Sequence, residues 1–301
     1  MKDELEKFKI DEFLKCELEK ITNIYHFYSN KPYNFDSVRD DYIWFSELTD
    51  FNDPFEVIVK EGDFDFNTLN KKQFTKFLMC NPFIEIADKD TGNSFNPSKY
   101  PENIVGKLVD ERFTELATPI NNIVMQTIDE KQKNKFQCFT HDIKNNPLQN
   151  RLMWSHYSDG LRGFVIEFNF DGLLDSLSKH NPRNFGGYTL MNYTNFGFND
   201  YIKAVIDSKK PLFIDRMLFT KHLDWCYENE VRILCTQNKG FYDATCISRI
   251  IIGKKMPQEN REELINILDR KGLLSKTHVA TFNRDNFTLD VSESLCNKVN
   301  Q

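Results

Sequence analysis

The apolar residues of this chain occur in short runs, and this pattern limits the possible folds more than any other feature. The clearest run, Phe164–Phe170, directly follows Gly163 and has the length of a buried β-strand. Such runs alternate with stretches of helical periodicity at irregular intervals, which favours an α+β fold over a doubly wound sheet of regular βαβ units. The other predicted strands are Ile24–Ser29, Tyr42–Ser46, Phe136–Thr140, Tyr188–Tyr193, Glu230–Cys235 and Ile247–Gly253.

Helical periodicity predicts how the rest of the chain is organised. We expect a single domain over residues 1–301, with an N-terminal helix over 1–22, a largely helical insertion over 62–135 and the main sheet-forming half over 136–268. Further helical segments are predicted over 201–224 and Gln258–Leu268, with a helix start at Asp53–Glu56.

Composition excludes several classes of protein. Lys and Arg number 39 against 45 Asp and Glu, so the formal charge is 39 − 45 = −6, which disfavours general coating of nucleic-acid phosphates. No run of about 18 apolar residues occurs, so we expect no membrane-spanning helix. The first residues lack a secretion signal, and the seven scattered cysteines suit reduced thiols, so we expect a cytoplasmic protein.

Common catalytic motifs are missing. The chain has no G-x-G-x-x-G, no P-loop, no H-E-x-x-H and no G-x-S-x-G, so Rossmann, P-loop, zincin and α/β-hydrolase chemistry lose their usual sequence support. The six histidines are too widely separated for a local metal-binding motif, and the cysteines form no C-x-x-C pair. We therefore expect no metal.

The strongest chemical signal lies in residues 225–234. In a strand, Glu228, Glu230 and Arg232 would share one face, and Val231 would begin the apolar face. Two carboxylates about 7 Å apart, beside a cation, can stabilise a cationic transition state. The alternative interpretation is an edge strand whose charged face is solvated.

Two aromatic groups are further candidates. His26 and Tyr28 would share one strand face and could contact a ribose and stack on a base. Trp154 and Tyr157 are three residues apart, so they could pack together on a helical turn beside His156. In both groups the alternative is a core histidine that packs among aromatic side chains.

Several segments together resemble the bacterial DUF2971 family in order and spacing, over residues 24–268. The family has no firmly assigned activity. One departure is Leu161, where we expect a histidine two residues before Gly163. The segments that carry the resemblance are Tyr25–Ser29, Ile43–Ser46, Phe51–Glu56, Cys138–Thr140, Met153–Tyr157, Trp225–Ile233 and Ile250–Gly253.

The same layout resembles the ADP-ribosyltransferase superfamily, which implies a split, mainly antiparallel β-sheet that binds NAD in a cleft. The resemblance implies Glu230 as the catalytic carboxylate and Glu228 as the group that orients or deprotonates the nucleophile. It places His26 against the adenosine-side ribose. Residues implied near the nicotinamide or elsewhere along NAD are Tyr28, Trp44, Ser46, Trp154, His156, Tyr157, Trp225 and Arg232.

Three functions follow as hypotheses. The first is an NAD-consuming transferase or glycohydrolase, such as a toxin or anti-phage effector, whose acceptor is a protein, a nucleic acid or water. The second is a module that binds a nucleotide without turnover. The third assigns every cluster to the core, and it predicts that His26, Trp154 and Glu230 lie far apart. Convergence of His26 and Glu230 on one cleft would favour the first.

Overall fold

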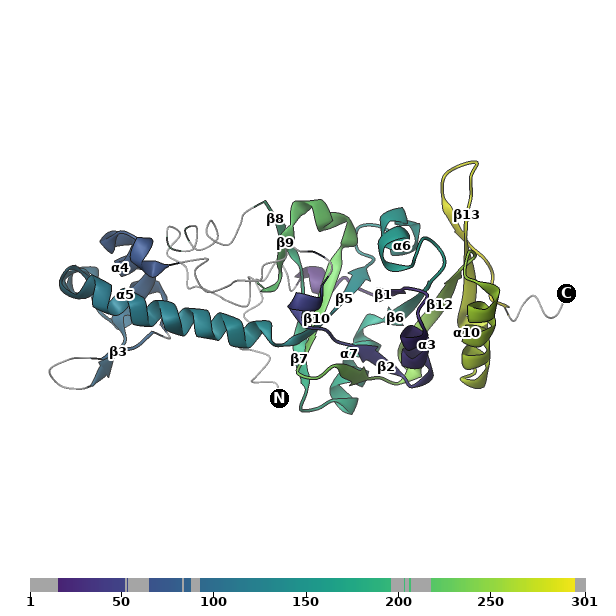
Figure 1. Cartoon of the computed structure of the whole chain (residues 1–301), viewed down its shortest axis with the longest axis horizontal. Helices are drawn as coiled ribbons and strands as arrows, with labels where there is room; N and C mark the ends of the chain where they lie inside the picture. The colour runs from purple at the N-terminus through teal and green to yellow at the C-terminus, as the bar shows by residue number, and fades with distance from the viewer. Residues whose placement is uncertain are drawn as a thin grey trace. The chain divides into compact units, whose positions relative to one another are not determined.

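The computed structural model describes residues 16–51, 53, 65–82, 84–87, 93–195, 203, 206 and 218–295 (Figure 1). The chain forms two compact units. The first unit comprises Met1–Asp50, Asn134–Asn192 and Asp224–Gln301, and the second comprises Phe51–Lys133 and Tyr193–Leu223. Most of the helix predicted over 1–22, the helix start predicted at Asp53–Glu56 and most of 201–224 lie outside the described residues.

An eight-stranded sheet forms the centre of the first unit. Its strand order is β14-β13-β12-β6-β1-β5-β10-β7, and every neighbouring pair is antiparallel except β12 and β13. The predicted α+β class with a mainly antiparallel sheet is therefore confirmed. The strands are β1 (Asn23–Tyr28), β5 (Lys135–His141), β6 (Phe164–Asn169), β7 (Phe185–Leu190), β10 (Glu230–Cys235), β12 (Ile247–Gly253), β13 (Thr277–Phe282) and β14 (Leu289–Val291).

One face of this sheet, here called the apolar face, carries most of the core. Ile24, Ile166 and Val231 point to this face and are fully buried. It packs against α3 (Pro32–Arg39), α7 (Phe170–His180) and α10 (Gln258–Arg270), and a two-stranded sheet of β2 (Tyr42–Trp44) and β11 (Lys239–Phe241) continues this layer. The 3-10 turns η6 (Ala244–Cys246) and η7 (Leu274–Lys276) also pack into this layer, and a third, η1 (Leu48–Asp50), follows β2 in the chain.

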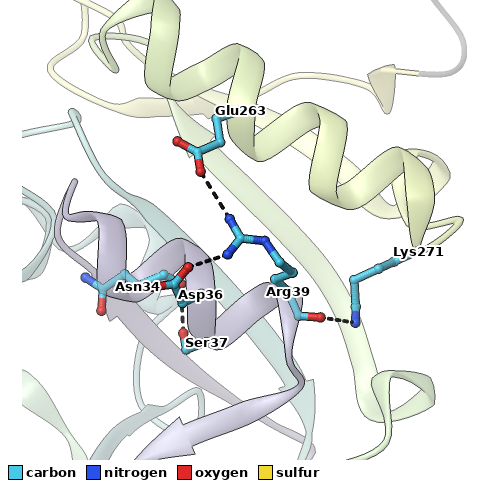
Figure 2. A network of polar contacts seen from close by, with 6 residues as sticks. All are labelled: Asn34, Asp36, Ser37, Arg39, Glu263 and Lys271. Carbon is cyan, nitrogen blue, oxygen red and sulfur yellow. Dashed lines mark hydrogen bonds and ion pairs between the residues drawn. The ribbon is translucent and has the colours of Figure 1, made fainter.

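Polar contacts join α3 to α10 at the surface of this layer (Figure 2). Arg39 bridges Asp36 in its own helix and Glu263 in α10, the latter at 3.2 Å. Lys271 Nζ donates to the Arg39 carbonyl oxygen at 3.0 Å and lies 2.6 Å from Asp41 Oδ2. These contacts hold the end of α3 against the C-terminal end of α10.

The opposite face, here called the α6 face, is covered by α6 (Arg151–Tyr157) and the preceding 3-10 turn η4 (Pro147–Gln149), and Figure 1 shows α6 across the sheet from α3. Phe27 packs against Trp154 with ring centroids 5.5 Å apart. Asn150 starts α6 because its side chain accepts hydrogen bonds from the first backbone N–H groups.

Two helices of the first unit, α3 and α7, were not predicted from the sequence. Pro32 is the first residue of α3, a position that suits its fixed φ and its missing N–H. We placed Phe170 in a strand, whereas β6 ends at Asn169 and α7 begins. The Asn169 side chain accepts a hydrogen bond from Gly172 N at 2.8 Å and so caps the helix.

The second unit is mainly helical in its described residues. It contains α4 (Lys71–Cys80), which begins with a capping box between Asn70 and Gln73, and α5 (Glu102–Gln132), which departs from helical geometry at Arg112. Both helices lie within the range 62–135. Its other elements are η2 (Phe66–Thr68), β3 (Ile86–Ala87), β4 (Ser94–Phe95), η3 (Pro97–Lys99), β8 (Asn192–Thr194) and β9 (Thr220–His222).

No helix in the described part of the chain is both long and apolar enough to cross a bilayer. The longest, α5, carries charged residues in its first half, up to Glu115, and again at Asp129–Lys131.

Candidate functional site

A line of polar side chains crosses the α6 face from strand to strand. Arg249, Glu167, Tyr25, Thr140 and Glu230 are direct neighbours across β12, β6, β1, β5 and β10. Directly paired residues point to the same face, so these five side chains form one row, here called the polar row. All except Arg249 are buried.

Each end of the polar row carries an ion pair. Arg232 Nε and Nη2 each lie 2.8 Å from Glu230 Oε1, and both side chains are almost fully buried. At the other end Arg249 Nε lies 2.6 Å from Glu167 Oε2. Burial raises the pKa of Tyr25, which lies between them, and the Glu167 carboxylate adds to the rise.

These contacts exclude the interpretation of β10 as a solvated edge strand. β10 lies between β5 and β7, and Arg232 on its charged face is 0% exposed. Taking charges out of water is costly unless they are paired and hydrogen-bonded. The buried charges of Glu230 and Arg232 are therefore tolerated inside the sheet because they pair with each other.

The predicted strand relation between Glu228 and Glu230 is wrong. β10 begins at Glu230, Glu228 is the last residue of the 3-10 turn η5 (Leu223–Glu228), and Asn229 between them has φ +44°. A left-handed residue breaks the alternation of a strand. The Glu228 carboxylate nevertheless lies on the α6 side, because the Tyr157 hydroxyl donates a hydrogen bond to it.

Four rings from two elements meet beside Glu228 and are here called the aromatic cluster: His156, Tyr157, Trp225 and Tyr227. Their centroids are 6.0–6.5 Å from ring to ring, and His156 Nδ1 lies 3.0 Å from the Tyr227 hydroxyl. His156 is exposed and the other three rings are half-buried. The cluster thus presents ring surface and polar atoms to solvent above a buried carboxylate.

Trp154 does not belong to this surface. It is 2% exposed, and its Nε1 donates to the Leu148 carbonyl oxygen at 3.0 Å. Since its one polar group is satisfied inside the protein, its place in the structure is that of a core residue.

The expected convergence of His26 with Glu230 is not found. Tyr25 belongs to the polar row, so the alternation of β1 turns His26 and Tyr28 to the apolar face. There the two rings meet at 4.1 Å, and Tyr28 stacks on Phe164.

Two further predicted residues also lie away from the polar row. Trp44 is 49% exposed on the two-stranded sheet of β2 and β11. Ser46 pairs through its backbone with Phe136. Neither side chain is brought to Glu230 by the strand pairing.

The sequence argument missed four of the five members of the polar row, all except Glu230. Glu167 is the one acid in the apolar run Phe164–Phe170, and Arg249 is the one charged residue in Ile247–Gly253. A lone charge inside a run that is otherwise apolar predicts a buried partner. That signal was available, although it does not say that Glu167 and Arg249 are each other's partner.

Burial lowers the pKa of His26 from its ordinary 6.5 to about 4, and burial lowers that of His141 to about 4 as well. Between about pH 6.5 and pH 4, these histidines therefore bind protons in the unfolded chain that they do not accept in the folded protein. The stability contributed by neutral His26 is complete above about pH 6.5 and is lost as the pH falls towards 4, by up to about 3 kcal/mol.

We expect His26→Gln to flatten the loss of unfolding free energy between pH 6.5 and 4, measured by urea denaturation at several pH values. His180→Gln, at an exposed position, is the matched control and should keep the wild-type slope. Equal slopes for wild type and His26→Gln would show that the fold does not lower the pKa of His26.

Comparison with known proteins adds one finding. Residues 153–233 match the family model described as "Protein of unknown function (DUF2971)". The similarity to the DUF2971 family is therefore shown for this segment of the chain. No curated protein and no solved structure matches it.

The DUF2971 match contains the aromatic cluster together with Glu228, Glu230 and Arg232. Tyr25, Thr140 and Arg249 of the polar row lie outside it. Leu161, where the family pattern suggested a histidine, is 7% exposed and belongs to the core of the α6 face. This position is occupied by an apolar core residue here.

Proposed function

We propose that this protein binds NAD at the aromatic cluster and is an ADP-ribosyltransferase-like enzyme. One observation carries the proposal: within the matched segment, four rings from α6 and η5 contact one another, and one of them, Tyr157, donates a hydrogen bond to the buried carboxylate of Glu228. Rings with exposed faces suit a planar base, and a carboxylate beside them suits the positive charge that develops on a ribose.

The reaction breaks the bond between the ribose carbon and the nicotinamide nitrogen, and the electron pair leaves with nicotinamide. The ribose becomes oxocarbenium-like, and a carboxylate stabilises it through a hydrogen bond to a ribose hydroxyl. We assign this contact to Glu228, because Tyr157 connects it to the exposed rings. Glu230, whose Oε1 is bonded to buried Arg232, would support the site from beneath.

An acceptor then attacks the ribose carbon and gives its proton to a carboxylate or to water. The acceptor is a protein, a nucleic acid or water. A cytoplasmic toxin or anti-phage role belongs to the same proposal.

The test is release of nicotinamide from NAD by purified protein, alone and with DNA, RNA or cell lysate. We expect Glu228→Gln to lower the rate about 100-fold or more while the protein stays folded, because an electrostatic contact to the transition state is lost. Glu259→Gln, on the exposed side of α10, is the matched control and should keep the full rate. An undiminished rate in Glu228→Gln would contradict the assignment.

The second candidate is a nucleotide-binding module without turnover. It is favoured by the burial of Glu230, whose Oε1 already accepts two hydrogen bonds from Arg232. This candidate predicts that NAD quenches Trp225 fluorescence and is recovered intact. It also predicts that Glu228→Gln leaves the affinity within a few-fold, whereas loss of the stacking ring in Trp225→Ala weakens binding.

A further inference from the structure

Three connecting segments of the first unit meet at one end of the large sheet. Residues 29–31 follow β1, residues 158–163 precede β6, and residues 253–261 lead from the last residue of β12 into α10. Because β6 is antiparallel to both β1 and β12, the three segments lie at the same end of neighbouring strands. Together they are here called the basic end.

Hydrogen bonds join the segments of the basic end to one another. Asn30 N donates to Asp159 Oδ2 at 2.7 Å, and Asn260 Nδ2 donates to Asn30 Oδ1 at 2.9 Å. Lys255 N donates to the Leu161 carbonyl oxygen at 3.0 Å. Each segment is thus bonded directly to another, so their side chains start from adjacent stretches of backbone.

The basic end carries an excess of positive charge. It has five cationic side chains against two acidic ones, Asp159 and Glu259, so its formal charge is 5 − 2 = +3, whereas that of the whole chain is −6. All the cations except Arg261 are exposed, and none of the five forms an ion pair within the described part of the chain. They are Lys31, Arg162, Lys254, Lys255 and Arg261. Such a patch complements a partner with several negative charges.

The turn that carries Arg162 is held by several hydrogen bonds. Arg162 N and Gly163 N both donate to the Ser158 carbonyl oxygen, at 3.2 Å and 2.9 Å. Asp159 and Leu161 have φ +49° and +72°, which is rare for residues other than glycine. This conformation buries Leu161 and leaves Arg162 exposed. Since the backbone of the turn is already fixed, little further ordering is needed when Arg162 binds an anion.

An aromatic ring accompanies these cations. Tyr33 lies in the first turn of α3, two residues after Lys31, and is 62% exposed. Asn34 Nδ2 donates to the Ser29 carbonyl oxygen at 2.8 Å, so this helical turn is bonded to the basic end. Proteins that bind single-stranded nucleic acid combine cations for the phosphates with aromatic rings on which bases stack. A duplex keeps its bases paired inside, so an exposed ring favours a single strand.

We infer that the basic end binds a single strand of RNA or DNA. Lys31, Arg162, Lys254 and Lys255 contact successive phosphates, and Tyr33 stacks on a base. The net charge of −6 disfavours general coating of phosphates, and it is compatible with contact that is confined to this end. The inference does not depend on the proposed function.

The test is fluorescence anisotropy of labelled oligo-U and oligo-dT, each of about 20 nucleotides, with the full chain at several KCl concentrations. We expect Arg162→Gln and Lys255→Gln each to weaken binding about fivefold at about 0.1 M salt. Each should also reduce the slope of log affinity against log salt by about 0.7, because one phosphate contact is lost. Tyr33→Ala should weaken binding about tenfold and leave this slope unchanged, because a stacking contact releases no counterion.

Arg270→Gln is the matched control, because Arg270 is exposed at the last residue of α10, at the helix end remote from Arg261. It should keep the wild-type affinity and slope. Equal weakening in Arg270→Gln and Arg162→Gln would overturn the inference, since binding would then follow the charge of the whole chain. Failure to bind either oligonucleotide at about 0.05 M salt would also overturn it. If the protein sediments with vesicles of phosphatidylglycerol and phosphatidylcholine and binds neither oligonucleotide, the partner is an anionic membrane instead.

Discussion

Arg232→Ala is expected to lower the free energy of unfolding of the first unit by about 3–5 kcal/mol. Arg232 is fully buried, donates twice to Glu230 Oε1 and lies over the Phe136 ring at 5.8 Å. Its removal leaves a buried carboxylate without its guanidinium, and the desolvation cost of that charge is no longer offset. Tryptophan fluorescence in urea measures the effect, because Trp44, Trp154 and Trp225 all lie in the first unit.

Arg151→Ala is the control for this change, since Arg151 is exposed on α6. Its free energy of unfolding should stay within about 0.5 kcal/mol of the wild-type value. The double variant Glu230→Gln with Arg232→Met should recover part of the loss, because it removes both charges. An Arg232→Ala loss below about 1 kcal/mol would mean that water reaches the pair.

Gly163→Ala is expected to be the second most damaging change, at about 3 kcal/mol or more, because the added methyl group has no space. Its Cβ would come within 1.9 Å of the Tyr28 carbonyl oxygen and 3.1 Å of Ser158 Cα. Both obstacles are backbone atoms, so one of the strands β1 or β6 must move. Urea denaturation followed by tryptophan fluorescence checks this.

Gly106→Ala makes the same chemical change at a site with no atom within 4 Å of the new methyl group. Gly106 lies in α5, where alanine is the better helix former, so this variant should gain roughly 0.5–1 kcal/mol in the second unit. A far-UV circular dichroism melt is the measurement. Equal effects at the two glycines would mean that the close approach of the added methyl group to the Tyr28 carbonyl oxygen at Gly163 does not lower stability.

Much of the fold could be predicted from local patterns. The strand predicted over Ile247–Gly253 is β12, and the helix predicted over Gln258–Leu268 is most of α10. The pair of strands β13 and β14 lies after residues 136–268, the range that we assigned to the sheet. Predictions failed where one residue overrides periodicity: Asn169 caps α7 directly after β6, and left-handed Asn229 separates Glu228 from β10.

The site was less predictable than the fold. Charge and ring content directed attention to the segment around Trp225 and Glu230, because acids beside an apolar strand are unusual. Yet the grouping with His26 failed. His26 and Tyr25 are adjacent in the sequence and face opposite sides of the sheet, so a shift of one residue decides which of them meets Glu230.

By itself, the sequence determined the class of fold, most strand positions and the alternation of side chains within each strand, because these depend on local periodicity. Only the tertiary structure decided that Arg249, Glu167, Tyr25, Thr140 and Glu230 form one row across five strands. The strand order and register along this row come from pairing between residues that are 82 to 142 positions apart, from Arg249 with Glu167 (249 − 167) to Glu167 with Tyr25 (167 − 25). Such pairing depends on the burial of the whole sheet face, so no short stretch of sequence specifies it.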